Sequence, residues 1–202
     1  VGENGAGKST LGKILAGIHR PDGGSIVIDG RAVSFASPRD AARVGVGMVH
    51  QELAFCPDLS VAENLCMGRY PRRFGMLDRP AMRRRAGELL GRIGVDMDVD
   101  RTLRTLPTAQ EQLVQIAAAV GTGARILIFD EPTSSLSDPE AQRLFALIDE
   151  LRSRGTTILY VSHRMPEIFR LCDRISILRD GRHVGTINRA DASPDRLVQM
   201  MI

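Results

Sequence analysis

A glycine-rich run at the start of the chain constrains the fold more than any other feature. Residues 2–9 fill the pattern G-x-x-x-x-G-K-[ST] in register, and a threonine follows directly. Glycine lets the backbone curl so tightly that successive N–H groups point at phosphate oxygens, and the dipole of the following helix adds its positive end. Such a loop joins a strand to a helix in P-loop NTPase α/β folds. The run therefore predicts that the chain binds a nucleoside triphosphate.

The residue types within the loop predict separate roles. Lys8 is expected to reach the β and γ phosphates, and Ser9 to hold Mg²⁺. Lys8 and Lys13 are the only lysines of a sequence that otherwise uses arginine, and a compact ammonium suits this loop better than a planar guanidinium. A glycine-rich turn that only caps a helix is the alternative. It is disfavoured by the full register of the motif and by the apolar helical pattern that follows, at Leu11, Ile14, Leu15 and Ile18.

The position of the loop predicts an N-terminally truncated fold. A phosphate loop lies between a strand and a helix, yet only Val1 precedes Gly2. We expect the first strand to lie outside this sequence, together with any adenine-stacking aromatic residue supplied from upstream.

Composition fits an ordinary globular chain. The 202 residues are 43% apolar and 25% charged, enough for one core with a small satellite subdomain. No apolar run approaches the roughly 18 to 20 residues of a membrane-spanning helix, and no signal peptide is visible. The net charge of +3 indicates no nucleic-acid partner. Cys56, Cys66 and Cys172 lack metal-ligand spacing and are predicted to be reduced cytosolic thiols that fill apolar space.

Short apolar runs alternate with helical patterns, which predicts an α/β fold around a largely parallel sheet with an antiparallel β portion. Strands are expected at residues 26–28, before a tight Asp29-Gly30 turn, and at 44–49, 125–129, 156–161, 174–178 and 183–187. Helices are expected at residues 61–67, 81–93, 110–120, 138–152 and 166–171. Residues 57–120 show no strand pattern and are predicted to form a helical subdomain. It is inserted into a core of residues 1–56 and 121–202, within one domain spanning 1–202.

A second group of polar residues follows the buried strand at residues 125–129. Asp130 should lie at the carboxyl edge of the sheet, where it can support Mg²⁺, and Glu131 should face the attacking water. The alternative is that these two acids only form a turn. The presence of the phosphate loop in the same chain disfavours that interpretation. The strand at 156–161 leads in the same way to His163, a candidate contact for the γ phosphate, although a histidine at a strand end is usually structural.

These motifs together resemble the ATP-binding cassette (ABC) ATPases over essentially residues 1–202. The resemblance implies ATP and Mg²⁺ as ligands, with Glu131 as general base and His163 and Lys8 completing the catalytic set. It also implies that Gln51 is a Mg²⁺ ligand together with Ser9 and Asp130. The implied ATP-binding residues are Gly2, Glu3, Asn4, Gly5, Ala6, Gly7, Lys8, Ser9, Thr10 and Gln51.

Several phrases resemble the carbohydrate-importer branch of this family, which takes up ribose, xylose, arabinose and galactosides. They lie at residues 47–53, 61–65, 113–117, 160–169 and 178–182. The resemblance implies the first of two cassettes in one polypeptide, peripheral to the cytoplasmic face of the inner membrane. The implied partners are a second ABC cassette, membrane permease subunits and, indirectly, a periplasmic sugar-binding protein, with no nucleic acid. Alternatives are a soluble tandem cassette acting on the ribosome or DNA, and a cassette that binds ATP with little turnover.

The chain departs from the family pattern at two places. The signature Leu-Ser-Gly-Gly-Gln reads here Leu106, Pro107, Thr108, Ala109 and Gln110, and Ser137 stands where aspartate is commonest. In this family the signature contacts the nucleotide of the opposite cassette. Proline removes a hydroxyl and an N–H donor, so we expect a weaker composite site that keeps the N–H groups of residues 108–110.

An arginine-rich stretch falls within the expected helical subdomain. A solvated face is the preferred interpretation, and docking beneath a membrane subunit or near anionic headgroups is the alternative. The stretch comprises Arg69, Arg72, Arg73, Arg79, Arg83, Arg84 and Arg85.

Overall fold

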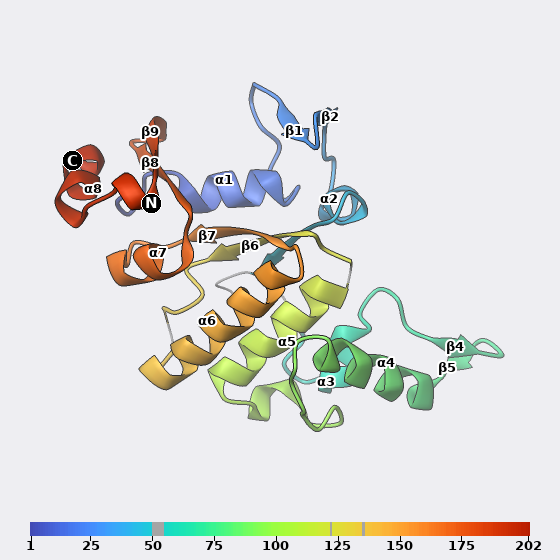
Figure 1. The fold of residues 1–202 in the computed structure, drawn as a ribbon. Helices are drawn as coiled ribbons and strands as arrows, with labels where there is room; N and C mark the ends of the chain where they lie inside the picture. Colours follow the sequence, from blue (N-terminus) through green and yellow to red (C-terminus); the bar gives the residue numbers. More distant parts are fainter. Residues whose placement is uncertain (50–54, 122, 135) are drawn as a thin grey trace.

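A three-stranded parallel sheet forms the centre of the fold. The computed structural model describes residues 1–49, 55–121, 123–134 and 136–202. The sheet has the order β3-β6-β7, with β3 at Val46–Val49, β6 at Ile126–Asp130 and β7 at Thr157–Val161. Helix α1 (Lys8–Leu15) covers one face, and helices α5 (Thr108–Gly121) and α6 (Asp138–Ser153) cover the other (Figure 1). The predicted α/β fold around a parallel sheet is confirmed.

The described residues also form three antiparallel hairpins outside this sheet. They pair β1 (Ile26–Ile28) with β2 (Arg31–Val33), β4 (Arg72–Arg73) with β5 (Met76–Leu77), and β8 (Arg174–Arg179) with β9 (Arg182–Asn188). Each pair is joined by two residues with positive φ, at 50° and 75° for Asp29 and Gly30, 52° and 82° for Phe74 and Gly75, and 49° and 74° for Asp180 and Gly181. This is the twisted turn that suits two-residue hairpins.

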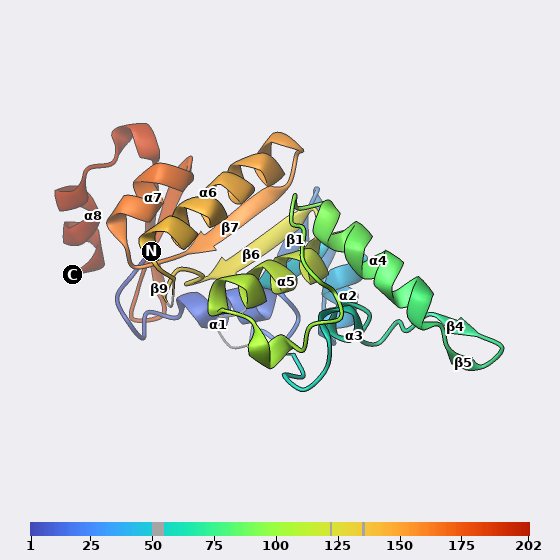
Figure 2. The same ribbon diagram turned by 90° about the horizontal axis from the view of Figure 1, so that it is seen from below.

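The remaining helices lie around the sheet and at the two ends of the molecule. They are α2 at Pro38–Arg43, α3 at Val61–Leu65, α4 at Arg79–Gly91, α7 at Met165–Leu171 and α8 at Pro194–Met201, with 3-10 turns at Leu103–Thr105 and Arg189–Asp191. Helices α3 and α4 lie beside α5, while α4 carries the β4–β5 hairpin at its outer end and α8 lies near the C-terminus (Figure 2). No helix of the described residues is long and apolar enough to cross a bilayer.

Local sequence signals set the helix starts. Ser60 and Glu63 form a reciprocal capping box at α3, and the Ser60 backbone N–H, then its hydroxyl, lower the pKa of Glu63. The carboxylate of Asp78 accepts the backbone N–H of Ala81 at 2.9 Å at the start of α4. At α6, the Glu140 carboxylate accepts the backbone N–H of Ser137 at 2.8 Å. Ser137 therefore caps the start of helix α6.

One buried cluster joins the sheet to the helices on its lower face in Figure 1. Leu127 and Phe129 of β6 share this cluster with Leu90 of α4, Ile116 of α5 and Ile148 of α6. The helical segment at residues 57–120 is thus packed into the main core. Because β6 packs against these helices, its carboxyl end is held in a defined position.

Most expected elements are confirmed, but two expectations are wrong. Residues 57–120 contain the β4–β5 hairpin, which is too short for an alternating pattern to reveal. Cys56 is exposed and fills no apolar space, whereas Cys66 is buried. The sequence patterns also left α2 and α8 without a prediction.

Candidate active site

The loop at residues 2–7 needs glycine for two different reasons. Gly5 and Gly7 have φ of 85° and 89°, in the left-handed region that residues with a side chain rarely adopt. At Gly2 the obstacle is space, since a Cβ atom there would lie 2.2 Å from the carbonyl oxygen of Leu178 on β8. The strand β8 also accepts and donates backbone hydrogen bonds with Val1, which anchors the start of the loop.

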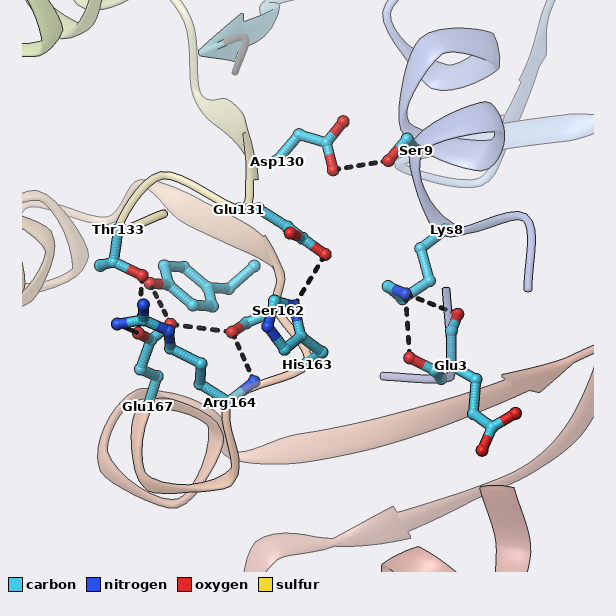
Figure 3. A network of polar contacts seen from close by, with 12 residues as sticks. Glu3, Lys8, Ser9, Asp130, Glu131, Thr133, Ser162, His163, Arg164 and Glu167 are labelled. Atoms are coloured by element: carbon cyan, nitrogen blue, oxygen red, sulfur yellow. Dashed lines mark hydrogen bonds and ion pairs between the residues drawn. The ribbon is translucent and has the colours of Figure 1, made fainter. Parts of the chain in front are cut away.

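Lys8 is a buried cation at the centre of this loop. Its side chain is 7% exposed, and Nζ donates to the carbonyl oxygens of Gly2 and Glu3, each at 2.9 Å (Figure 3). Among the described residues no carboxylate forms an ion pair with it. A buried ammonium that is held only by neutral carbonyls lacks a charge partner. The loop therefore fits an anionic ligand such as a phosphate group.

Ser9 and Asp130 bring two oxygen atoms together beside this cation. The hydroxyl of Ser9, at the start of α1, donates to Oδ1 of Asp130 at 3.0 Å, and Asp130 ends strand β6 (Figure 3). No group of three or more histidine, cysteine or acidic residues lies together in the described part of the chain. Mg²⁺ commonly uses one or two protein oxygens and completes its shell with phosphates and water. The pair fits that kind of magnesium site, and Gln51 lies outside the described residues.

Glu131 and His163 meet at the carboxyl ends of β6 and β7. Oε1 of Glu131 lies 3.1 Å from Nδ1 of His163, and the carboxylate of Glu131 points toward the side of the site where Lys8 lies (Figure 3). Glu131 has a φ of 46°, an uncommon conformation for a residue with a long side chain. Its backbone N–H donates to the carbonyl of Val161 at 2.9 Å, which fixes the turn to β7. Strained backbone of this kind is common at functional sites.

Glu167 is a buried acid that the sequence analysis missed. Its carboxylate accepts three hydroxyl hydrogen bonds, from Thr133 at 2.6 Å, Tyr160 at 2.9 Å and Ser162 at 2.8 Å (Figure 3). Burial, and then this neighbouring carboxylate, raise the pKa of Tyr160 far above its usual range. Its position in the helix is the signal that could have identified it, because Glu167 lies on the same buried face of α7 as Ile168 and Leu171.

These bonds tie together the two segments that carry the Glu131–His163 pair. Thr133 follows Glu131 by two residues, and Ser162 directly precedes His163. On the other side, Nε2 of Gln112 on α5 donates to the carbonyl of Pro132 at 2.6 Å. The turn after Asp130 is therefore held from both α5 and α7.

Replacing Glu167 by glutamine is expected to lower the free energy of unfolding by about 2 kcal/mol. The amide nitrogen of glutamine cannot accept a hydrogen bond, so at least one buried hydroxyl loses its partner. Urea denaturation followed by circular dichroism measures the change. Glu150→Gln is the matched control, because Glu150 is exposed and its carboxylate pairs with Arg154, which caps the end of α6. Equal stability of both variants would contradict the assigned hydrogen bonds.

The signature region begins helix α5. Leu106 is buried, while Pro107 and Thr108 are exposed. The carbonyl of Pro107 accepts the backbone N–H groups of Gln110 at 2.9 Å and Glu111 at 3.1 Å. The expectation that Gln110 offers its N–H to an anion is therefore wrong, because that group already closes the first turn. The N–H groups of Thr108 and Ala109 are left at the helix start, with Ala109 partly buried.

Residues 1–134 match the family model described as ABC transporter. Two curated relatives are the ribose import ATP-binding protein RbsA 2 of Burkholderia ambifaria, 50% identical, and the arabinose import ATP-binding protein AraG 1 of Burkholderia cenocepacia, 48% identical. Each alignment covers 100% of this chain and 40% of the relative, so the chain spans less than half of their length.

Solved structures show the same fold. A crystal structure of a nucleotide-free ATP-binding cassette from an ABC transporter aligns with a TM-score of 0.84, at 21% identity, over 100% of this chain and 85% of that chain. A dimeric cassette in a post-hydrolysis state, bound to ADP and Pi, aligns with a TM-score of 0.76, at 24% identity, over 93% and 83% of the two chains. The fold and the site thus define an ATP-binding cassette. The chain belongs to the ABC transporter family.

Proposed function

We propose that this chain is a nucleotide-binding cassette of a carbohydrate importer, which binds and hydrolyses MgATP to drive sugar uptake through a membrane permease. The observation that carries the proposal is the convergence of buried Lys8 with Asp130 and the Glu131–His163 pair at one edge of the sheet. The similarity to ribose and arabinose import proteins along the whole chain supports sugars as the cargo.

Each residue of the site has a part in hydrolysis. Lys8 and the loop N–H groups bind the β and γ phosphates. Glu131 is the general base that takes a proton from the attacking water, and His163 positions Glu131 and contacts the γ phosphate. Ser9 and Asp130 would hold Mg²⁺, together with Gln51, and that ion would neutralise the charge developing on the phosphates. Glu167 fixes the two segments on which the Glu131–His163 pair stands.

The proposal includes partners and a place in the cell. A second cassette of the same polypeptide supplies the opposing signature, residues 57–120 form the subdomain that faces the permease, and a periplasmic binding protein delivers the sugar. The assembly places the chain at the cytoplasmic face of the inner membrane. Tandem cassettes that act on the ribosome are the alternative, with no specific observation in this structure in their favour.

Two measurements test the proposal. The purified protein is assayed for Mg²⁺-dependent ATP hydrolysis, and cells that lack it are assayed for uptake of radiolabelled ribose and arabinose. We expect hydrolysis, and uptake that is restored by the wild-type protein but not by Glu131→Gln. Hydrolysis with normal uptake of both sugars in the deleted cells would exclude them as the cargo.

Replacing Pro107 by serine is expected to strengthen the composite site that uses this signature. The new hydroxyl adds a hydrogen bond to a charged phosphate, which corresponds to about 10-fold to 100-fold tighter ATP-driven closure at that site. The measurement is single-site turnover in the two-cassette protein with the phosphate loop around Lys8 disabled. Robust turnover of that protein while Pro107 is still present would contradict a weakened site. Thr105→Ser, an exposed change just before the signature, is the control.

A further inference from the structure

The β4–β5 hairpin has a turn sequence that its own folding does not explain. The three hairpins of the described residues use the same two-residue turn, and two of them place Asp-Gly in it. The third places Phe74 at the first position, with a φ of 52°. Asparagine and aspartate tolerate this left-handed conformation, whereas a bulky aromatic residue is strained there. The backbone of the turn therefore disfavours the residue that occupies it.

Packing within the chain does not explain Phe74 either. Its side chain is 90% exposed, and its ring contact is with the guanidinium of Arg73, 5.5 Å from the ring centroid. Met76 and Leu77 on the adjoining strand are 71% and 52% exposed. Three large apolar residues thus stand together in water on a short hairpin. Exposed apolar clusters of this kind mark surfaces that contact a partner.

The charges around these residues have one sign. Arg69, Arg72 and Arg73 are exposed, and none of them forms an ion pair among the described residues. Residues 64–77 contain no aspartate or glutamate. The next acid, Asp78, already accepts the N–H of Ala81 at the start of α4. An apolar tip between unpaired arginines complements a partner that has an anionic outer surface and an apolar interior.

We propose that the hairpin of residues 69–77 inserts Phe74, Met76 and Leu77 into the interface of a bilayer with anionic headgroups, while its arginines bind those headgroups. This rests on the proposed function, which places the chain beside a membrane. Apolar residues with arginines around them are typical of elements that lie in the membrane interface. The hairpin projects past the outer end of α4, clear of the sheet and the nucleotide loop, in both views (Figure 1, Figure 2). A fluid bilayer accepts such a narrow tip without a shaped pocket.

Tryptophan fluorescence provides a direct test, because the chain contains no tryptophan. Phe74→Trp keeps an aromatic tip and adds a single fluorophore. The purified variant, without nucleotide, is mixed with phosphatidylcholine vesicles that contain about a third phosphatidylglycerol. We expect a blue shift of the emission with these vesicles at low salt, a smaller one at high salt, and none with pure phosphatidylcholine. An unshifted emission with anionic vesicles would overturn the proposal.

Co-sedimentation with the same vesicles separates the apolar and charged contributions. Phe74→Asn suits the turn, so it should keep or improve hairpin stability while it weakens vesicle binding about 10-fold. Arg72→Gln combined with Arg73→Gln should weaken binding about 30-fold, as expected for two arginines near an anionic surface. The matched control is Val27→Asn on the β1–β2 hairpin, where Val27 is 59% exposed. An effect of the control equal to that of Phe74→Asn would overturn the assignment.

The readouts distinguish this inference from the proposed function. Vesicle binding is measured without ATP, and all of these variants should keep the wild-type rate of ATP hydrolysis because the hairpin lies outside the site. Hydrolysis without vesicle binding overturns the lipid contact alone. If the protein does not bind vesicles but Phe74→Asn abolishes its co-purification with the permease, the partner of the hairpin is a protein, and the lipid proposal is wrong.

Discussion

Replacing Lys8 by alanine is expected to weaken MgATP binding by about 100-fold or more, because a hydrogen-bonded pair with a charged phosphate contributes up to about 3 kcal/mol. Lys8 is the buried cation of the loop, and the motif predicts that its ammonium binds the β and γ phosphates. Isothermal titration calorimetry measures the affinity. Circular dichroism shows whether the fold is retained, which matters because Lys8 also bonds the carbonyls of Gly2 and Glu3.

Lys13→Ala is the matched control for this variant. Lys13 is the only other lysine and lies on the same helix, with no side-chain hydrogen bond or ion pair among those found in the described residues. We expect its affinity for MgATP to stay within about 3-fold of wild type, as for a surface change. Equal affinity of Lys8→Ala and Lys13→Ala would refute the phosphate-loop assignment.

Replacing Glu131 by glutamine is expected to reduce ATP turnover by about 100-fold or more while MgATP remains bound, because an amide cannot accept the proton of the attacking water. Glutamine keeps the size of the side chain and can still bond His163. In the assembled protein the variant should accumulate the closed state of two cassettes. Steady-state phosphate release gives the rate, and nucleotide titration gives the affinity.

Two further variants make this result specific. Asp130→Asn should change the Mg²⁺ concentration needed for half-maximal turnover, because Asp130 bonds Ser9 at the proposed metal position. Glu140→Gln is the control. Glu140 is also a glutamate, but its carboxylate accepts the backbone N–H of Ser137 at the start of α6, so turnover should stay near wild type. If Glu131→Gln hydrolyses ATP at close to the wild-type rate, another group is the base.

The sequence predicted the centre of the fold well because its signals there are strong and local. A motif filled in register defined the loop around Lys8, and four apolar residues followed directly by two acids defined the buried strand before Asp130. In parallel sheets those carboxyl ends share one edge. That rule was sufficient to expect the Lys8, Asp130 and His163 neighbourhood seen in the structure.

The parts that escaped prediction depend on distant contacts or on very short elements. Glu167 looked like an ordinary acid of a short helix, and its role depends on Thr133, 34 residues away along the chain. The strands β4 and β5 have two residues each, which is too short for alternation to be recognised.

The two carbonyl bonds of Lys8 leave one of its N–H donors for a ligand, because an ammonium has three donors. The carbonyls of Gly2 and Glu3 fix the position of Nζ, so a phosphate can accept the third donor without displacing either of them. A side chain that is already fixed loses little rotamer freedom when it binds. A small anion gains this one contact, whereas a polyphosphate that also reaches Ser9 and the helix start gains contacts at several points. The carbonyls of the loop thus preorganise its lysine for a polyphosphate.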